Sequence, residues 1–191
     1  MKYPTHQAGY SLVEVLVAIS ILLIATVGPM TIAARSLQYA QFSAQQNTAF
    51  FLAQEGIEAI FAIRAEAGLA HLAPGGPASW IWTTGSDLSD CRATTGCGID
   101  WRDTSLMSNV VGCNSGGCQI YYDETNAPAR YSHDASGVAT PYTRVITISD
   151  PSGIPNEVQV TSTVRWDGAG NQPGRSVVLQ TYLQDIYDTS P

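Results

Sequence analysis

The hydrophobic and polar positions divide the chain into a long apolar opening and a mixed remainder. Residues 15–34 form a run of 20 residues without a formal charge, in which only Ser20, Thr26 and Thr31 carry polar side chains. Twenty helical residues cover roughly 30 Å, which matches the hydrocarbon core of a bilayer. A helix also satisfies its own backbone hydrogen bonds, as lipid requires. The pattern therefore predicts a membrane-spanning helix over residues 10–35.

The pattern beyond residue 35 predicts that the same helix continues. Residues 36–67 contain no proline and a single glycine, Gly56, and they are rich in good helix formers. We expect Gly68 to terminate the helix, and the Pro-Gly-Gly-Pro run at 74–77 cannot continue it. Apolar residues recur at steps of three and four, with gaps, which indicates an imperfect amphipathic stripe. Its members are Leu37, Ala40, Ala44, Phe51, Leu52, Ile57, Ile60, Phe61 and Ile63.

Residues 68–191 have the pattern of a β-rich globular domain. Several segments combine β-branched and aromatic residues, some with period-two alternation, and clusters of Gly, Pro, Asn and Asp separate them as turn signals. Glycines are dense before residue 118, so the strands there are expected to be short. The predicted strands are residues 80–82, 99–101, 119–123, 129–133, 142–149, 157–166 and 176–183.

These elements fit together as an α+β fold. An antiparallel sheet with one apolar face needs a cover, and the outer half of the helix offers an apolar stripe. A helix over residues 10–67 would hold 58 residues and measure roughly 87 Å, which is too long for this domain to bury. We therefore expect residues 36–67 to pack on the sheet and residues 10–35 to contact lipid first.

Gly28 and Pro29 interrupt the apolar run. Proline removes one helical hydrogen bond and its ring clashes with the preceding turn, so a kink or a melted turn is expected at residues 24–30. The alternative is a proline that the membrane helix simply tolerates.

Glu14 is an isolated carboxylate at the start of the apolar segment. A carboxylate costs roughly 2.5–3.5 kcal/mol at the centre of a membrane and less near its surface. One interpretation leaves Glu14 at the membrane surface. The other pairs it with a cation: the leader after Lys2 has no firm base, but a cut after Gly9 would free an α-amine on Tyr10, four residues before Glu14.

Residues 9–14, Gly-Tyr-Ser-Leu-Val-Glu, with the apolar run behind them, resemble the N-terminal motif of type IV prepilins and type II secretion pseudopilins. The resemblance implies that prepilin peptidase removes leader 1–9 and that Tyr10 becomes an N-methylated N-terminus. It implies that Glu14 docks the subunit into a filament and that the helix loosens near Pro29 on assembly. Tyr10 stands where Phe is commoner, and the resemblance covers only residues 1 to about 40.

The competing interpretation of the same stretch is an ordinary secretory signal, cut after a small residue such as Ala33 or Ala34. Glu14 inside the would-be apolar region argues against it, and so does the single lysine of the leader, Lys2.

Composition narrows the classes of partner. The formal net charge is −7, and the basic residues are one lysine and eight scattered arginines, so no basic patch supports nucleic-acid binding. Only 13% of residues are charged, a profile usual for exported β-rich domains.

The four cysteines lie close together in the sequence, beyond the membrane segment. An even, clustered set in an exported domain indicates two disulfides, for which three pairings exist. The favoured pairing is the local one, Cys91 with Cys97 and Cys113 with Cys118. The crossed pairings would tie two glycine-rich loops together. A zinc site is the rival, but the C-x5-C and C-x4-C spacings depart from zinc motifs. The residues are Cys91, Cys97, Cys113 and Cys118.

No catalytic constellation is predicted, and no cofactor or metal is expected. The chain has no G-x-S-x-G sequence and no P-loop, and oxidised thiols cannot serve as nucleophiles. The histidines outside the leader are expected at the surface. Two glutamates one turn apart are interpreted as helix surface with a possible contact to a partner subunit, and four aspartates as solvated loop carboxylates rather than a calcium loop. The histidines are His71 and His133, and the glutamates are Glu55 and Glu58. The aspartates are Asp87, Asp90, Asp100 and Asp103.

Two functions of different class follow. The first is a minor pilin or pseudopilin, held in the cell membrane with its N-terminus cytoplasmic and its domain outside, then assembled with other pilin subunits into a filament. The second is a membrane-anchored binding or adhesin module that uses the cysteine-rich loops of residues 68–118. The sequence leaves open whether such a filament would serve a type IV pilus, type II secretion or competence.

Overall fold

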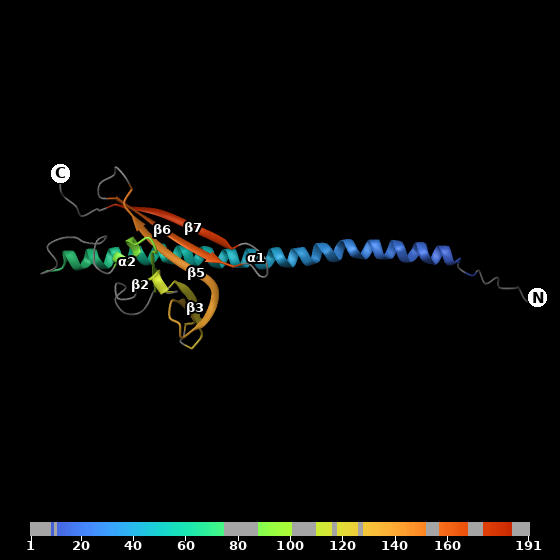
Figure 1. Ribbon diagram of the computed structural model, residues 1–191, viewed down its shortest axis with the longest axis horizontal. Helices are drawn as coiled ribbons and strands as arrows, with labels where there is room; N and C mark the ends of the chain where they lie inside the picture. The colour runs from blue at the N-terminus through green and yellow to red at the C-terminus, as the bar shows by residue number, and fades with distance from the viewer. Residues whose placement is uncertain are drawn as a thin grey trace, which may run out of the picture. The chain divides into compact units, whose positions relative to one another are not determined.

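The computed structural model is an α+β protein with a long N-terminal helix and a seven-stranded antiparallel sheet (Figure 1). This confirms the predicted fold class. The chain divides into two units, residues 1–45 and 46–191. The structure describes residues 9, 11–74, 88–100, 110–115, 118–125, 128–151, 157–167 and 174–184.

Helix α1 spans Leu12–Leu72 and passes through Pro29. The helix is continuous over residues 24–30, so the melted turn considered from the sequence is not present there. Polar side chains of the apolar segment bond to the helix itself: the Thr26 hydroxyl donates to the Leu22 carbonyl at 3.0 Å, and the Thr31 hydroxyl donates to the Gly28 carbonyl at 2.8 Å. These internal bonds leave few polar groups for lipid to solvate.

The end of α1 lies beyond the predicted boundary at residue 67. The helix continues through Gly68, which is buried, and ends at Leu72, two residues before Pro74. Glycine inside a helix costs about 1 kcal/mol relative to alanine, which burial against the sheet unit can offset. Gly68 therefore belongs to the packed helix face rather than to a terminator.

Strand β5 is the centre of the sheet. On one side it pairs with β6, which pairs with β7. On the other side, its N-terminal half pairs with β3, which pairs with β4, and Ile146 in its C-terminal half pairs with β1, which pairs with β2. The strands are β1 Cys97–Ile99, β2 Val110–Gly112, β3 Gln119–Asp123, β4 Arg130–Ser132, β5 Val138–Ser149, β6 Glu157–Trp166 and β7 Arg175–Gln184.

The strand predictions from residue 119 onward are confirmed, with changes in extent. Strand β5 begins at Val138 rather than at residue 142, and it therefore runs through Pro141. Proline cannot donate to the ladder, and the pairing with β3 is irregular there. The Gln119 side-chain amide instead donates to the carbonyls of Thr140 at 2.6 Å and Tyr142 at 3.0 Å.

The predictions between residues 68 and 118 fit less well. The strand expected at residues 99–101 is β1, which lies earlier, at Cys97–Ile99. Strand β2 was not predicted, and neither were the short helix α2, Ser89–Arg92, and the 3-10 turn η3, Cys113–Ser115. The strand predicted at residues 80–82 lies outside the described residues.

Small residues let α1 approach the sheet closely. The buried face of the helix includes Ala49, Ala53, Gly56 and Ala59, while Phe51 and Phe61 of the predicted stripe are 67% and 43% exposed. A Cβ atom at Gly56 would lie 2.7 Å from the Ser162 hydroxyl oxygen on β6. The prediction that the outer half of the helix covers the sheet is confirmed, but the phenylalanines do not form the cover. The core cluster joins Ile57, Ile60 and Ile63 of α1 to Ile99, Ile146, Ile148, Val158, Val160 and Leu183 of the sheet.

A buried arginine joins helix and sheet. Arg144 on β5 is 1% exposed, and its guanidinium donates to the Leu52 carbonyl of α1 at 3.1 Å and to the Ile99 carbonyl of β1 at 2.6 Å. It also pairs with the Glu55 carboxylate at 3.2 Å. Glu55, predicted at the helix surface, has a side chain that is 36% exposed and also reaches the buried Arg144. Glu58 is exposed and accepts a bond from Gln54.

Candidate functional site

The N-terminal site is built on the first turn of α1. The helix begins at Leu12, and its first backbone bond runs from the Val15 amide to the Ser11 carbonyl at 3.2 Å. Glu14 lies in this first turn and its side chain is exposed. The helix dipole favours a carboxylate at this position, by about 0.3–1 kcal/mol at exposed sites.

Glu14 stands alone in an apolar surface. Among residues 11–34 it is the only one with a formal charge. Every residue from 11 to 41 is exposed, and the large side chains include Leu12 at 75%, Ile24 at 77% and Met30 at 76% exposed. Of the described residues, α1 is the one helix long and apolar enough to cross a membrane. Within lipid, such a carboxylate would need a cation as its partner.

The residues assigned to leader cleavage precede this turn in the sequence. Gly9 is exposed, and a Cβ built on it would meet no atom within 4 Å, so its backbone is open. Tyr10, the expected methylation site, lies outside the described residues. Gly28 lies in the same unit inside the helix, and a Cβ atom there would likewise meet nothing within 4 Å.

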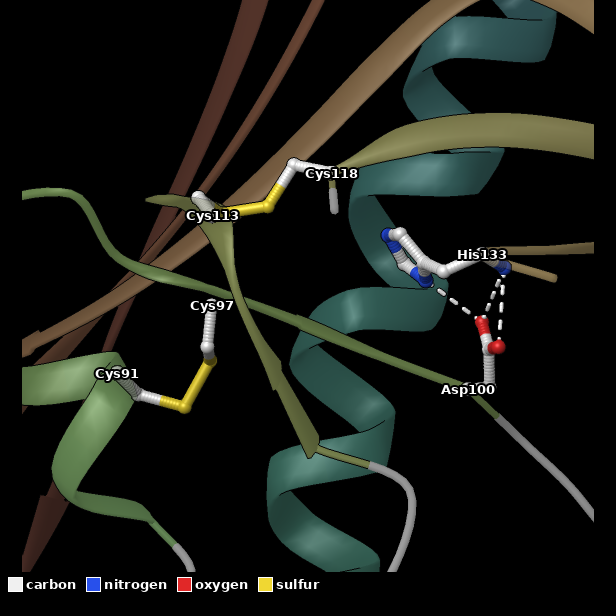
Figure 2. Close-up of a disulfide and its surroundings, with 6 residues drawn as sticks. All are labelled: Cys91, Cys97, Asp100, Cys113, Cys118 and His133. Carbon is white, nitrogen blue, oxygen red and sulfur yellow. Dashed lines mark hydrogen bonds and ion pairs between the residues drawn. A yellow bond between two sulfur atoms is a disulfide. The ribbon is translucent and has the colours of Figure 1, made fainter. Parts of the chain in front are cut away.

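The four cysteines form the two local disulfides, as predicted. Cys91 is bonded to Cys97, and Cys113 to Cys118, with no free cysteine left to bind zinc (Figure 2). The first bond joins α2 to β1, and Gly96 beside it has φ +69°, which a residue with a side chain adopts with strain. Both bonds are therefore structural links inside the sheet unit.

Asp100 and His133 form a buried pair that the sequence did not predict. Both Asp100 carboxylate oxygens accept the His133 backbone amide, at 2.7 and 2.9 Å, and one lies 2.6 Å from the imidazole Nδ1 (Figure 2). The His133 side chain is 1% exposed and the Asp100 side chain 6%. Their expected places, as a surface histidine and a solvated carboxylate, were wrong. Among the other aspartates, Asp90 is exposed as expected, whereas Asp87 and Asp103 lie outside the described residues.

The environment of Asp100 favours its ionised form. Burial raises the pKa of the Asp100 carboxyl. The hydrogen bonds and charge of His133, with a contribution from the charge of Arg144, lower this pKa by more than burial raises it, so the pKa lies below the ordinary 3.8. A Cβ atom at Gly98 would lie 2.7 Å from the His133 ring, so the ring fills the space over that glycine. Such an enclosed pair ties the end of β1 to the end of β4 and is not placed to meet a substrate.

No sequence signal short of the fold identifies this pair, because its members stand 33 positions apart. By contrast, Gly9, Tyr10 and Glu14 lie within six consecutive residues. In the structure, Glu14 lies in the first turn of α1. The disulfides and the Asp100–His133 pair belong to the other unit, residues 46–191.

Helix α1 opens with an apolar segment that carries one carboxylate, and the sheet unit has a core of its own. Residues 4–28 match the family model described as the prokaryotic N-terminal methylation motif, which is the prepilin signal of type IV pilin-type precursors. No curated protein and no solved structure matches the chain. The match ends within α1 and does not reach the sheet unit.

The motif supports a type IV pilin-like precursor, and proteins of this kind are structural subunits rather than enzymes. It implies processing by a prepilin peptidase and assembly with other pilins. Together with the apolar helix, it suggests anchoring in a membrane.

Proposed function

We propose that this chain is a minor pilin or pseudopilin. Prepilin peptidase cuts it after Gly9, the new N-terminal Tyr10 is N-methylated, and the subunit passes from the membrane into a pilus-like filament. The observation that carries the proposal is Glu14, a lone exposed carboxylate in the first turn of α1 and the fifth residue after the proposed cut.

The docking step is electrostatic. A carboxylate enters an apolar helix bundle at a high cost unless a cation meets it there. Cleavage after Gly9 supplies that cation as the α-amine of Tyr10, on the same chain or on a neighbour. An incoming subunit is therefore favoured only where its Glu14 finds an amine.

The helix surface fits this role. Residues 11–41 bury nothing within the chain, whereas the sheet unit has a core of its own. The first part of α1 is thus free to contact lipid before assembly and other helices afterwards. The two disulfides favour an oxidising compartment for the sheet unit, as expected for a domain exposed outside the cytoplasm.

The residues Gly28 and Pro29 give the helix a place to loosen on assembly. In the single chain the helix is continuous there. Pro29 supplies no backbone N–H, so this turn lacks one hydrogen bond that other turns have. We propose that subunit contacts in the filament open this turn.

The direct test is the exchange of Glu14→Gln, with Glu58→Gln as the matched control on the same helix. Both substitutions remove one exposed carboxylate and preserve side-chain size. The Glu14→Gln subunit should be inserted and cleaved normally but should fall at least about tenfold in sheared filaments, which corresponds to about 1.4 kcal/mol of lost docking free energy. The Glu58→Gln subunit should enter filaments as the wild type does. Immunoblots of membrane and sheared fractions measure both.

Equal amounts of the two variants in the filament fraction would contradict the docking role of Glu14. If the wild-type chain itself never leaves the membrane fraction, the filament assignment fails, and the anchored binding module becomes the better account.

A further inference from the structure

The sheet has a face that α1 does not cover. On β6, Val160, Ser162 and Val164 are buried on the helix side, and the residues between them point to the opposite side. Pairing with β5 and β7 aligns these residues in rows across the three strands. The outer face, as we call it, consists of the odd-numbered residues of 145–149 and 159–163 and the even-numbered residues of 178–182.

The outer face is uncharged and rich in hydroxyl and amide groups. Its middle row is Thr147, Thr161 and Gln180, and no position of the face carries a formal charge, although the chain has a net charge of −7. On the same side of β6, the charged residues are Glu157 and Arg165, close to the two ends of the strand. Hydroxyl and amide groups both donate and accept hydrogen bonds. Such a face suits a neutral ligand that is itself dense in hydroxyl groups.

Tyr182 gives the outer face an aromatic ring in a fixed orientation. It is 56% exposed, and its hydroxyl accepts a bond from the Gln159 amide at 2.9 Å, which restrains the ring before a ligand arrives. In the middle row, the Gln180 amide donates to the Thr161 hydroxyl at 3.3 Å. Each bond uses one of the two N–H groups of its amide, so the second N–H and the amide oxygen can bond to a ligand. The ring can then stack on the C–H face of a sugar while these groups bond to its hydroxyls.

The composition of the outer face favours a polysaccharide over a protein as the ligand. Tryptophan, tyrosine and arginine dominate the binding energy of protein interfaces, whereas serine, threonine and valine are under-represented there. The outer face has a single tyrosine, and most of its other positions are serine, threonine or valine. Three strands at a spacing of about 4.8 Å present these groups on a strip roughly 10 Å wide, which accommodates an extended chain of sugars. We propose that the outer face binds a neutral, β-linked polysaccharide.

The packing of α1 leaves the outer face accessible. The helix contacts the opposite side of the sheet through Ile57, Ile60 and Ile63. A subunit that assembles through the exposed side of α1 therefore keeps the outer face turned away from its helix contacts. Binding of a polysaccharide goes beyond the proposed filament role and does not require assembly. It also uses a different surface from the cysteine-rich loops considered for an adhesin.

Binding of the purified full-length protein, in mild detergent, to insoluble polysaccharides tests the proposal. The probes are cellulose, chitin and β-mannan, which are neutral and β-linked; starch, which is neutral and α-linked; and cross-linked pectate, which is a polyanion. We expect retention on at least one β-linked probe and none on pectate, because the outer face offers no cation and the chain is acidic. Retention on none of the β-linked probes, or stronger retention on starch or pectate, would overturn the proposal.

Substitutions then place the binding on the outer face. Tyr182→Ala should raise the dissociation constant about tenfold through the loss of stacking. Thr163→Val keeps shape and strand preference but removes a hydroxyl, and should raise the constant about threefold. The control is Tyr39→Ala, which removes a tyrosine that is 71% exposed on α1 and should bind as the wild type does.

Thermal unfolding of each variant separates lost binding from lost folding. The Thr163→Val protein should unfold at the temperature of the wild type and still bind more weakly. Wild-type binding by both Tyr182→Ala and Thr163→Val would overturn the assignment of the site, and so would an equal loss of binding in Tyr39→Ala. These results are independent of whether the chain enters a filament, because the assay contains no assembly machinery.

Discussion

Asp100 and Arg144 are the charged side chains that the described part of the sheet unit buries, and each makes several polar contacts, although Nε of Arg144 has no hydrogen-bond partner. Arg144 bonds to α1 and to β1, while Asp100 holds the backbone and the ring of His133. Removing one member of a buried polar set costs more than the set contributes, because its partners stay behind unsatisfied. These residues therefore fix how α1, β1 and β4 come together. These contacts could not be predicted from the sequence, because the partners stand 33 to 92 positions apart along the chain.

The lowered pKa of Asp100 predicts an acid-dependent loss of stability. A depressed carboxyl pKa contributes stability above the ordinary value of 3.8, and that contribution is lost as pH falls through the lower folded pKa. At neutral pH, Asp100→Asn should lower the free energy of unfolding by about 1–3 kcal/mol, because the amide cannot accept all three contacts. Below about pH 4 the difference between variant and wild type should shrink.

Thermal unfolding of the purified full-length protein across pH measures this prediction. Glu124→Gln, an exposed carboxylate beyond the end of β3, is the control and should leave the curve unchanged. A constant difference between Asp100→Asn and wild type from pH 7 down to pH 3 would contradict the assigned role.

At the scale of elements, hydrophobic periodicity located the long helix and the strands after residue 119. Residues 157–166 coincide with β6, and residues 119–123 with β3, because alternation and turn signals are local properties. The hydrophobic pattern did not predict the extent of an element where a contact with a residue distant in sequence determines it. Pro141 stays in β5 because Gln119 bonds to the carbonyls around it, and Gly68 stays in α1 because it is buried.

The two disulfides should differ in their resistance to reduction. Cys91 and Cys97 are fully buried and belong to the core cluster, whereas Cys113 is half-buried. Exchange needs access of a thiolate to sulfur. Under graded reductant, Cys113–Cys118 should therefore open first, as alkylation and peptide mass mapping would record.

Paired alanine variants give the matching stability test. Each bond closes a short loop and contributes at most about 2–3 kcal/mol by the chain-entropy model. Replacing Cys91 and Cys97 should cost more than replacing Cys113 and Cys118, since both members of the first pair belong to the core cluster, whereas in the second pair only Cys118 is buried. The prediction fails if both bonds open together or if the two double variants are equally stable.

The whole molecule combines a unit that completes its own core with a helix segment that does not. The N-terminal motif within residues 4–28 could be identified from the sequence because its residues are adjacent and ordered. The position of β7 at an edge of the sheet could not be predicted from the sequence, because strand order within a sheet is not a local property of a sequence. The sheet unit lies outside the matched motif, so the motif says nothing about what the surfaces of that unit bind.

The central claim is that the chain is processed as a prepilin, and the mass of its N-terminal peptide tests that claim most directly. Protein recovered from native membranes should begin at Tyr10 and carry one methyl group on that amine, with leader 1–9 absent. A mature N-terminus just after Ala33 or Ala34 would show an ordinary secretory signal and contradict the account, as would an unprocessed chain that still begins at Met1.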